Sequence, residues 1–394
     1  MPACGVARWR HGTAGLAGCA VLVVACAGSG AGGGDLDGTS FSGEVHDVRV
    51  EVVADGFSHP WGLAFLPEGK ALVTERSGSL NLVNPASGDV REVAGAPAVA
   101  AVGQGGLLDV ALHPDYPEAE WIYLTWSAGA GGDGGYLTHV GRARLDVDAA
   151  RLDDLEVLIT AHPDSMSTQH FGSRLAFDAA GYLYVTSGDR GARDRAQDRN
   201  NLHGATLRLT AEGGIPADNP WIDDPDVADA LYSYGHRNAQ GMAVHPDTGD
   251  LWQSEHGPRA GDEINRIVAG GNHGWPLATY GREYGLGSAI GIYPHEDPDI
   301  VDPLHYWQEA SFAPSGLAFY DADRFPEWQG DVFVGSLVRT NLTRLRFDGD
   351  EVIAEEALLD DAALRIRDVR VGPSGYLHLL VDADPGAWLR LVPD

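Results

Sequence analysis

A histidine and an aspartate bracket one short stretch of the sequence, QHFGSRLAFDAAGYLYVTSGDRG, which begins at Gln169. His170 precedes an alternating apolar run, and Asp189 follows a second one. Two antiparallel strands joined by a tight turn return the chain to the side where it began, so both side chains are expected at one end of the pair. An imidazole beside a carboxylate is typical of a general base and the group that orients it. The stretch therefore predicts that His170 and Asp189 lie together at one end of the strand pair, with a hydrogen-bonded structural histidine as the alternative.

The strand–turn–strand pattern that carries this pair occurs six times along the chain. The copies start at Gly62, Leu107, Arg174, Gly241, Gly316 and Asp368. The intervals between these starts exceed the roughly 40–45 residues of a bare four-stranded blade and fit blades with inserted loops. The pattern predicts an all-β fold, a six-bladed β-propeller of four-stranded antiparallel blades, with an open β-sandwich as the alternative. The strand DVRVEVVADG from Asp47 is expected to complete the last blade and close the ring.

The repeat also sorts polar residues between the two faces of the ring. Residues just before the first strand and just after the second lie on the same face, beside the central channel. This face is predicted to receive Glu75, Arg76, Gln104, His170, Asp189, Arg190, Arg237, Asn238, residues 255–258, Arg365 and Arg367. The intervening turns, such as DAAG and GPSG, contain only turn-forming residues and lie on the opposite face.

Composition excludes several classes of chemistry. The formal net charge is −30, which argues against nucleic acid as a partner. Lys70 is the only lysine and lies in a turn, so a Schiff-base mechanism is excluded. The three cysteines are Cys4, Cys19 and Cys26, all in or next to the N-terminal segment, so the rest of the chain has no thiol nucleophile or Cys-ligated metal.

The N-terminal segment indicates export. Residues 1–25 carry Arg8 and Arg10 ahead of an apolar run, which predicts a lipoprotein-type signal peptide with Cys26 as the lipid-modified residue. An ordinary signal peptide followed by a chance cysteine is the alternative. Residues 26–44 read as a flexible Gly/Ser-rich tether, and residues 45–394 as the propeller. The expected location is periplasmic or at the cell surface, with the membrane reached only through the lipid anchor.

Five motifs then occur in register along the propeller. They are GQGGLLDVALHPDY, HFGSRLAF with GDRG, GHRNAQGMAVHP, EHGPRAGDEINRI with GGNHGWP, and RIRDV. With them the chain, from about Val48 to its end, resembles the soluble aldose dehydrogenases that depend on pyrroloquinoline quinone (PQQ). The resemblance implies oxidation of an aldose at C1 to the lactone. His170 would remove the C1 hydroxyl proton while hydride passes to the quinone, and Asp189 would stabilise the base.

The resemblance also implies how two cofactors are held. The flat tricarboxylate PQQ would be bound by arginines, whose planar forks pair with carboxylates, and by two amides. These residues are Arg237, Arg365, Arg367, Gln104 and Asn238. A calcium ion would be held by the carbonyls of Gly257 and Pro258, and a second one by Asp262 and Glu263. A solvated acidic turn is the alternative for the second site.

One position departs from the family pattern. Where the family has a lysine against the cofactor, this chain has Val338, followed by Arg339, whose side chain is expected on the opposite side of an extended strand. The expected partners are an aldose and a soluble electron acceptor. A calcium-dependent propeller lactonase and a non-catalytic binding propeller stay open as alternatives. Aromatic residues between Tyr280 and Phe312, including Tyr284, are expected to pack within their own loop.

Overall fold

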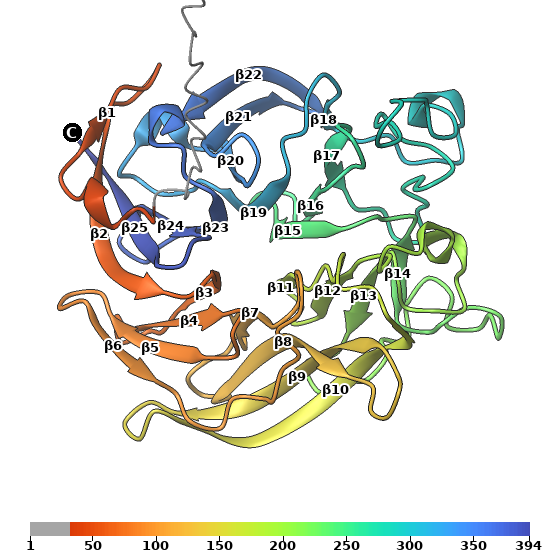
Figure 1. Ribbon diagram of the computed structural model, residues 1–394, viewed down its shortest axis with the longest axis horizontal. Helices are drawn as coiled ribbons and strands as arrows, with labels where there is room; N and C mark the ends of the chain where they lie inside the picture. The colour runs from red at the N-terminus through yellow and green to blue at the C-terminus, as the bar shows by residue number, and fades with distance from the viewer. Residues whose placement is uncertain (1–31) are drawn as a thin grey trace, which may run out of the picture.

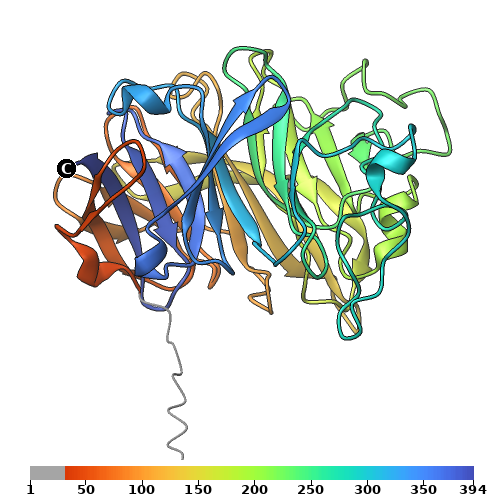
Figure 2. The ribbon, with the colours of Figure 1, turned by 90° about the horizontal axis from the view of Figure 1, so that it is seen from above.

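Six antiparallel sheets form a ring around a central axis in the computed structural model, which describes residues 32–394 (Figure 1). The sheets stand roughly side by side when the ring is seen edge-on (Figure 2). The architecture is therefore the predicted six-bladed β-propeller. No α-helix occurs in the described part of the chain, and accordingly none there is long and apolar enough to span a membrane.

Each blade except the last is built from four consecutive strands. The first blade has β3 (Pro60–Phe65), β4 (Ala71–Glu75), β5 (Leu80–Asn84) and β6 (Asp89–Glu92). The second has β7 (Leu107–Leu112), β8 (Trp121–Gly129), β9 (Tyr136–Asp146) and β10 (Arg151–Ser165). The third has β11 (Leu175–Phe177), β12 (Leu183–Ser187), β13 (Ala205–Leu209) and β14 (Leu231–Tyr234).

The second half of the chain continues the pattern. The fourth blade has β15 (Ala239–Val244), β16 (Leu251–Glu255), β17 (Asp262–Arg266) and β18 (His305–Trp307). The fifth has β19 (Pro314–Phe319), β20 (Val332–Ser336), β21 (Leu342–Asp348) and β22 (Glu351–Leu358). The sixth has β23 (Ile366–Val371), β24 (Leu377–Val381) and β25 (Gly386–Pro393). Short 3₁₀ helices are η1 (Gly34–Leu36), η2 (Arg193–Gln197), η3 (Pro294–Glu296), η4 (Pro326–Trp328) and η5 (Asp360–Ala362).

The N-terminal strand closes the ring, as predicted. β2 (Val48–Phe57) pairs antiparallel with β25, from Val48 opposite Pro393 to Phe57 opposite Gly386. β1 (Ser40–Phe41) adds a short fifth strand to this sheet. Joining the two ends of the chain in one sheet satisfies the edge of the last blade and makes opening of the ring costly.

The ordered propeller begins before residue 45. Leu36 of η1 packs against the hydrophobic core of the last blade, and Gly33 approaches Val381 so closely that a Cβ there would lie 3.2 Å from the valine methyl. Part of the segment expected as a tether therefore belongs to the folded unit. The predicted signal peptide and Cys26 lie outside the described residues.

Glycines in the innermost strands let neighbouring blades approach closely. A Cβ on Gly62 in β3 would lie 2.7 Å from the carboxylate of Asp109 in β7, and one on Gly316 in β19 would lie 2.5 Å from a backbone nitrogen of β23. In the channel, the buried Arg174 pairs with Asp109 and Asp368, at 3.0 Å each. The repeated GLAF-type motif thus reflects a packing requirement at the axis, where a buried charge network links three blades.

Candidate active site

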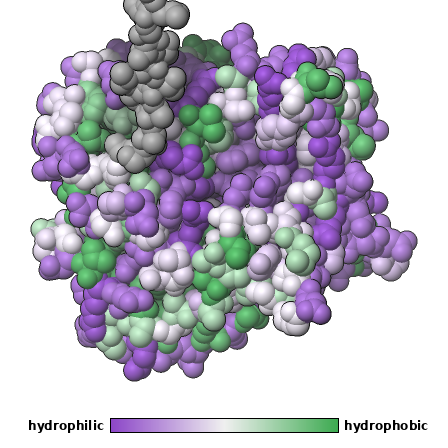
Figure 3. All heavy atoms as spheres, viewed as in Figure 1, coloured by the Kyte–Doolittle hydropathy of each residue, from purple (hydrophilic) through white to green (hydrophobic). Residues whose placement is uncertain are grey.

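A cavity of about 690 Å³ at the central channel gathers most of the predicted residues. It is lined by His59, Trp61, Arg76, Gln104, Gln169, His170, Arg237, Gln240, His256, Gly257, Pro258, Asp262, Tyr284, Ser311, Ala313, Leu337, Val338, Arg365, Arg367 and Asp382. Hydrophilic residues surround the centre of the ring in the space-filling view (Figure 3). Residues from six blades meet here because most of them lie at the start of a first strand, just after a second strand, or in a loop between strands.

His170 and Asp189 form the predicted pair. Nδ1 of His170 and Oδ1 of Asp189 are 2.6 Å apart, and the two residues are 8% and 1% exposed. Asp189 also accepts hydrogen bonds from the backbone N–H of Gly191 at 2.7 Å and from the indole N–H of Trp275 at 2.8 Å. His170 lines the cavity, whereas Asp189 lies behind it. The aspartate is therefore placed to orient the imidazole rather than to touch a ligand.

The tautomer of His170 follows from its contact with Asp189. Burial raises the pKa of Asp189, but the hydrogen bond and charge of His170, with the donors Trp275 and Gly191, lower it more, so the net shift is downward. An ionised carboxylate can only accept, so Nδ1 of His170 donates to it, and in the neutral imidazole the lone pair is on Nε2. A neutral His170 therefore has its basic nitrogen at Nε2.

The loop that carries His170 is held in an uncommon conformation. His170 has φ 55°, in the left-handed region. Its backbone N–H donates to Oε1 of Gln104 at 2.8 Å, and the N–H of Gly172 donates to Oδ1 of Asn238 at 3.1 Å. Gln104 lines the cavity as expected of a cofactor contact. Asn238 is fully buried outside the lining, so it supports the loop, and its Nδ2 makes no hydrogen bond with any described residue.

The three predicted arginines all line the cavity. Arg365 and Arg367 flank one strand residue, and both donate to Oδ2 of Asp382, at 3.3 and 2.8 Å, so they point to the same side. Arg237 donates to the carbonyl of His256 at 3.1 Å, which leaves most of its guanidinium unused. Since the whole chain is strongly acidic, this concentration of guanidinium groups marks a local site for an anion.

Several lining residues were not assigned roles from the sequence. Asp382 follows β24, accepts from the two arginines, and lies 2.7 Å from Nδ1 of His59. His256 lies between Arg367 and Arg237. Burial, followed by the charges of these arginines, lowers the pKa of His256 to about 3, so its imidazole is neutral at ordinary pH. Its Nε2 is 2.7 Å from the carbonyl of Pro314 and donates to it.

The predicted metal ligands divide between two places. Gly257, Pro258 and Asp262 line the main cavity, whereas Glu263 faces a small neighbouring cavity. Asp262 accepts backbone N–H groups of Gly257, Phe312 and Ala313 at 2.9, 2.6 and 3.1 Å, which makes it a brace for two loops. Burial raises the pKa of Asp262 despite these bonds.

Glu263 lies opposite Glu255 in the β16–β17 pair. Burial, and then the charge of Glu255, raise the pKa of Glu263 well above its usual value. Within residues 32–394 there is no group of three or more His, Cys, Asp or Glu side chains suited to a metal ion.

Val338, which stands where the family pattern has a lysine, lies at the central cavity. Val338 lines the cavity and is 56% exposed. Arg339 points elsewhere, but residues 337–339 form a bend after β20 rather than the extended strand on which that expectation rested. Its guanidinium lies 3.5 Å from Glu355 of β22 and 5.3 Å from the ring centre of Phe312. Arg339 therefore does not fill the place of the missing lysine.

The aromatic residues between β17 and β18 behave in two ways. Tyr280 stacks on Tyr306 with ring centres 3.6 Å apart and on Tyr293 at 5.5 Å, so these rings pack the loop as expected. Tyr284 differs. It lines the cavity, is 65% exposed, and donates its hydroxyl to the carbonyl of Pro258 at 2.8 Å. The expectation that it packs within its own loop was wrong, because its hydroxyl anchors the ring beside the cavity.

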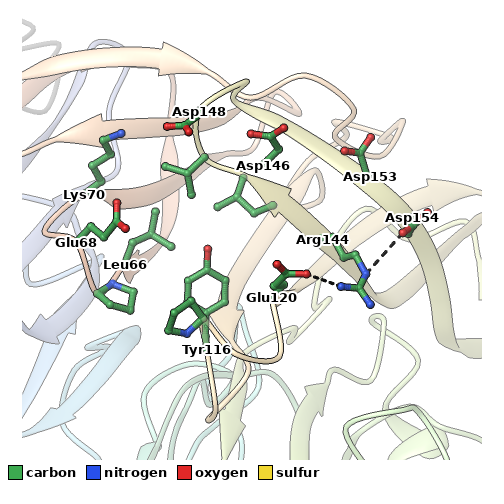
Figure 4. A pocket seen from close by; sticks show the side chains of 14 residues that line it. Leu66, Glu68, Lys70, Tyr116, Glu120, Arg144, Asp146, Asp148, Asp153 and Asp154 are labelled. Carbon is green, nitrogen blue, oxygen red and sulfur yellow. Dashed lines mark hydrogen bonds and ion pairs between the residues drawn. The ribbon is translucent and has the colours of Figure 1, made fainter.

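A second concavity, of about 550 Å³, lies among the β3–β4, β7–β8 and β9–β10 turns of the first two blades, on the face opposite the central cavity. Figure 4 shows carboxylates such as Glu120 and Asp154 around an apolar floor that includes Leu66 and Tyr116. Arg144 pairs with Glu120 at 2.6 Å and lies 3.6 Å from Asp154. The hydrogen-bonded His170–Asp189 pair stands instead at the central cavity.

The chain is similar to known sugar dehydrogenases. The glucose/sorbosone dehydrogenase family profile matches residues 57–390. The chain is 43% identical over 351 residues to the aldose sugar dehydrogenase YliI of Escherichia coli K12, which covers 88% of this chain and 93% of that protein. The crystal structure of the soluble E. coli aldose sugar dehydrogenase in its apo form aligns with a TM-score of 0.83 and 42% identity, over 88% of this chain and 100% of that one.

A ligand-bound structure also aligns. The PQQ-bound form of the aldose sugar dehydrogenase of Streptomyces coelicolor has a TM-score of 0.71 and 30% identity, over 90% of this chain and 100% of that one. The family profile spans all six blades and both members of the His170–Asp189 pair. The chain therefore belongs to the glucose/sorbosone dehydrogenase family of sugar-oxidising enzymes, which confirms the resemblance indicated by its motifs.

Proposed function

We propose that this protein oxidises aldose sugars at C1 to the lactone, using PQQ and calcium, with His170 as the general base. The observation that carries the proposal is the hydrogen-bonded His170–Asp189 pair beside a cavity lined by guanidinium groups. Family membership and the PQQ-bound relative support the same reaction class.

The lining residues fit a flat polycarboxylate. Among them are four arginines, Arg76, Arg237, Arg365 and Arg367, and only two carboxylates, Asp262 and Asp382. Among the described residues, the guanidinium of Arg237 donates only to the carbonyl of His256, so its other N–H groups are left for a ligand. Guanidinium groups hold carboxylates by paired hydrogen bonds, and amides such as Gln104 suit quinone and carboxylate oxygens alike.

The residues of the chain then have defined tasks. Nε2 of His170 accepts the proton of the sugar C1 hydroxyl as the C1–H bond breaks. Asp189 holds the imidazole in the required tautomer and stabilises its positive charge after proton uptake. The arginines and Gln104 fix the position of the cofactor against C1. When bound, PQQ supplies the acceptor for the hydride from C1.

Calcium is proposed through carbonyl ligation. The carbonyls of Gly257 and Pro258 belong to residues that line the same cavity, and carbonyl oxygens are suitable calcium ligands. Asp262 does not fit as a free ligand, because three backbone N–H groups already occupy its oxygens. Glu263 fits a second cation better, since a divalent ion would relieve its repulsion by Glu255.

Location and electron partner are proposed from the sequence. Residues 1–25 and Cys26 support export and lipid anchoring at the periplasmic face or the cell surface. Mass analysis of the mature protein would test this, and an unmodified N-terminus at Cys26 or elsewhere would contradict it. A soluble acceptor would reoxidise the cofactor.

Enzyme assay tests the function directly. Apoprotein would be incubated with calcium and PQQ and then given aldoses with an artificial dye acceptor. Dye reduction that requires the quinone is expected. Lactone cleavage without quinone would favour a calcium-dependent lactonase, and quinone uptake without any turnover would favour a binding propeller. His170→Ala is expected to bind PQQ as the native protein does but to lower kcat by about 100-fold or more.

A further inference from the structure

Arg76 is held in a fixed position at the wall of the central cavity. It follows β4 directly, and its backbone N–H donates to the carbonyl of His59 at 3.2 Å. A Cβ on Gly106 would lie 1.9 Å from the Arg76 carbonyl oxygen, so only glycine admits this approach from the second blade. The backbone of Arg76 is thus packed between two blades, and its side chain starts from a rigid base.

The guanidinium of Arg76 has one hydrogen-bonded nitrogen and one that is free to donate. Nη1 donates to the carbonyl of Gly103 at 2.9 Å. Nε is buried and therefore does not face the open cavity, whereas Nη2 is not buried and makes no hydrogen bond with any described residue. No carboxylate of residues 32–394 lies within ion-pair distance of Arg76, in contrast to Arg365 and Arg367, which share Asp382. Nη2 is therefore the group of Arg76 that can donate to an anion in the cavity.

The surrounding charges favour an anion near Arg76. Four arginines, Arg76, Arg237, Arg365 and Arg367, and only two carboxylates, Asp262 and Asp382, line the cavity. Asp382 is already shared by Arg365 and Arg367. The wall of the cavity therefore carries an excess of positive charge, which attracts an anion.

We propose that Arg76 is a further cofactor-binding residue, which donates from Nη2 to a carboxylate of the bound quinone. The inference rests on the proposed function, because it assigns one contact of the same ligand. It adds a binding contact from the first blade to those that Arg237 and the pair Arg365 and Arg367 provide from others. The cofactor would then be bound by arginines of three blades, the first, the fourth and the sixth.

Binding measurements test the proposal without relying on turnover. Equilibrium titration of apoprotein with PQQ, followed by quenching of tryptophan fluorescence, gives Kd for each variant. Arg76→Met is expected to raise Kd for PQQ on the order of 10- to 100-fold. This is the loss of affinity associated with removal of a charge-assisted hydrogen bond. Arg76→Gln retains a donor for the Gly103 carbonyl and is expected to show a similar loss, which guards against misfolding of the methionine variant.

Arg339→Met is the matched control. This substitution also removes one positive charge near the cavity, but Arg339 pairs with Glu355 and does not line the cavity. Kd for PQQ should therefore stay within about 2-fold of the native value. Equal Kd values for native protein and both Arg76 variants would overturn the inference while leaving the proposed function intact. So would a higher KM for aldose with unchanged Kd for PQQ. Failure of the native protein to bind PQQ would overturn both.

Discussion

Trp275 donates its indole N–H to Asp189 at 2.8 Å, on the oxygen that His170 does not use. Asp189 follows β12 in the third blade, whereas Trp275 lies in the long segment between β17 and β18 of the fourth. The contact therefore joins two blades behind the base. With both carboxylate oxygens engaged and only 1% exposure, Asp189 has one stable orientation, and it transmits that orientation to the imidazole.

Asp189→Asn is expected to lower kcat by at least about 10-fold without weakening PQQ binding. The amide cannot stabilise a protonated imidazole as an ionised carboxylate does, and it can present an N–H where an acceptor is needed. Because Asp189 does not line the cavity, Kd for PQQ should not change. Steady-state kinetics and fluorescence titration measure the two quantities.

Trp275→Phe is a graded control for this prediction. It keeps an aromatic ring but removes the N–H donor, so kcat should fall between the native value and that of Asp189→Asn. If Asp189→Asn retained native kcat, the orienting role of the aspartate would be refuted.

Val338→Lys is expected to tighten PQQ binding by about 10-fold. Val338 already lines the cavity, and an ammonium there would add an attraction for a polycarboxylate. Val338→Met serves as the uncharged control of similar length. Equal PQQ affinities for the two variants would show that a charge at position 338 does not affect binding. The existing guanidinium groups would then already supply all the hydrogen bonds and charge that the PQQ carboxylates need.

Tyr284→Ala is expected to raise KM for the sugar several-fold with little change in Kd for PQQ. The exposed ring beside the cavity offers an apolar face for a sugar, and the hydrogen bond to Pro258 fixes its tilt. Tyr284→Phe keeps the face and loses only that bond, so its KM should lie nearer the native value. A native KM for Tyr284→Ala would remove this residue from the substrate site.

Much of the fold was predictable because the signals are local. The alternation GLAF from Gly62 and the turn after it define β3 and β4, and the same pattern places the first strand of every blade. Ring closure by β2 was predictable because a propeller must satisfy its last edge. The rule that places His170 and Asp189 on one face also applies to His59 before β3 and to Asp382 after β24.

Other features depend on contacts that no local pattern reveals. Asp382 stands in DADPG, which resembles an ordinary turn, and its role appears only when Arg365 and Arg367 converge on it. Trp275 reaches Asp189 from a long segment without strand periodicity. Asp262 has a side chain that suits a metal ligand, but in the fold its carboxylate accepts hydrogen bonds from three backbone N–H groups.

Three histidines with low pKa values give the propeller a defined sensitivity to acid. Burial is the main cause that lowers the pKa of His203 to about 4, of His256 to about 3 and of His378 to about 3. An unfolded histidine has a pKa near 6.5, so between these values and pH 6.5 the unfolded chain binds more protons than the folded one. The free energy of unfolding should therefore decrease as pH falls below about 6.5.

His378→Gln isolates one of these contributions away from the active site. The imidazole Nδ1 of His378 accepts the indole N–H of Trp388 at 2.9 Å, and a glutamine carbonyl can accept in its place. The slope of unfolding free energy against pH between about 4 and 6.5 should become shallower by up to about 1.4 kcal/mol per pH unit, because one proton no longer binds on unfolding. Denaturant unfolding at several pH values measures it. Above pH 7.5 the two curves should run parallel, since the histidine is neutral in both states there, whereas equal slopes below pH 6.5 would show that His378 takes up its proton without unfolding.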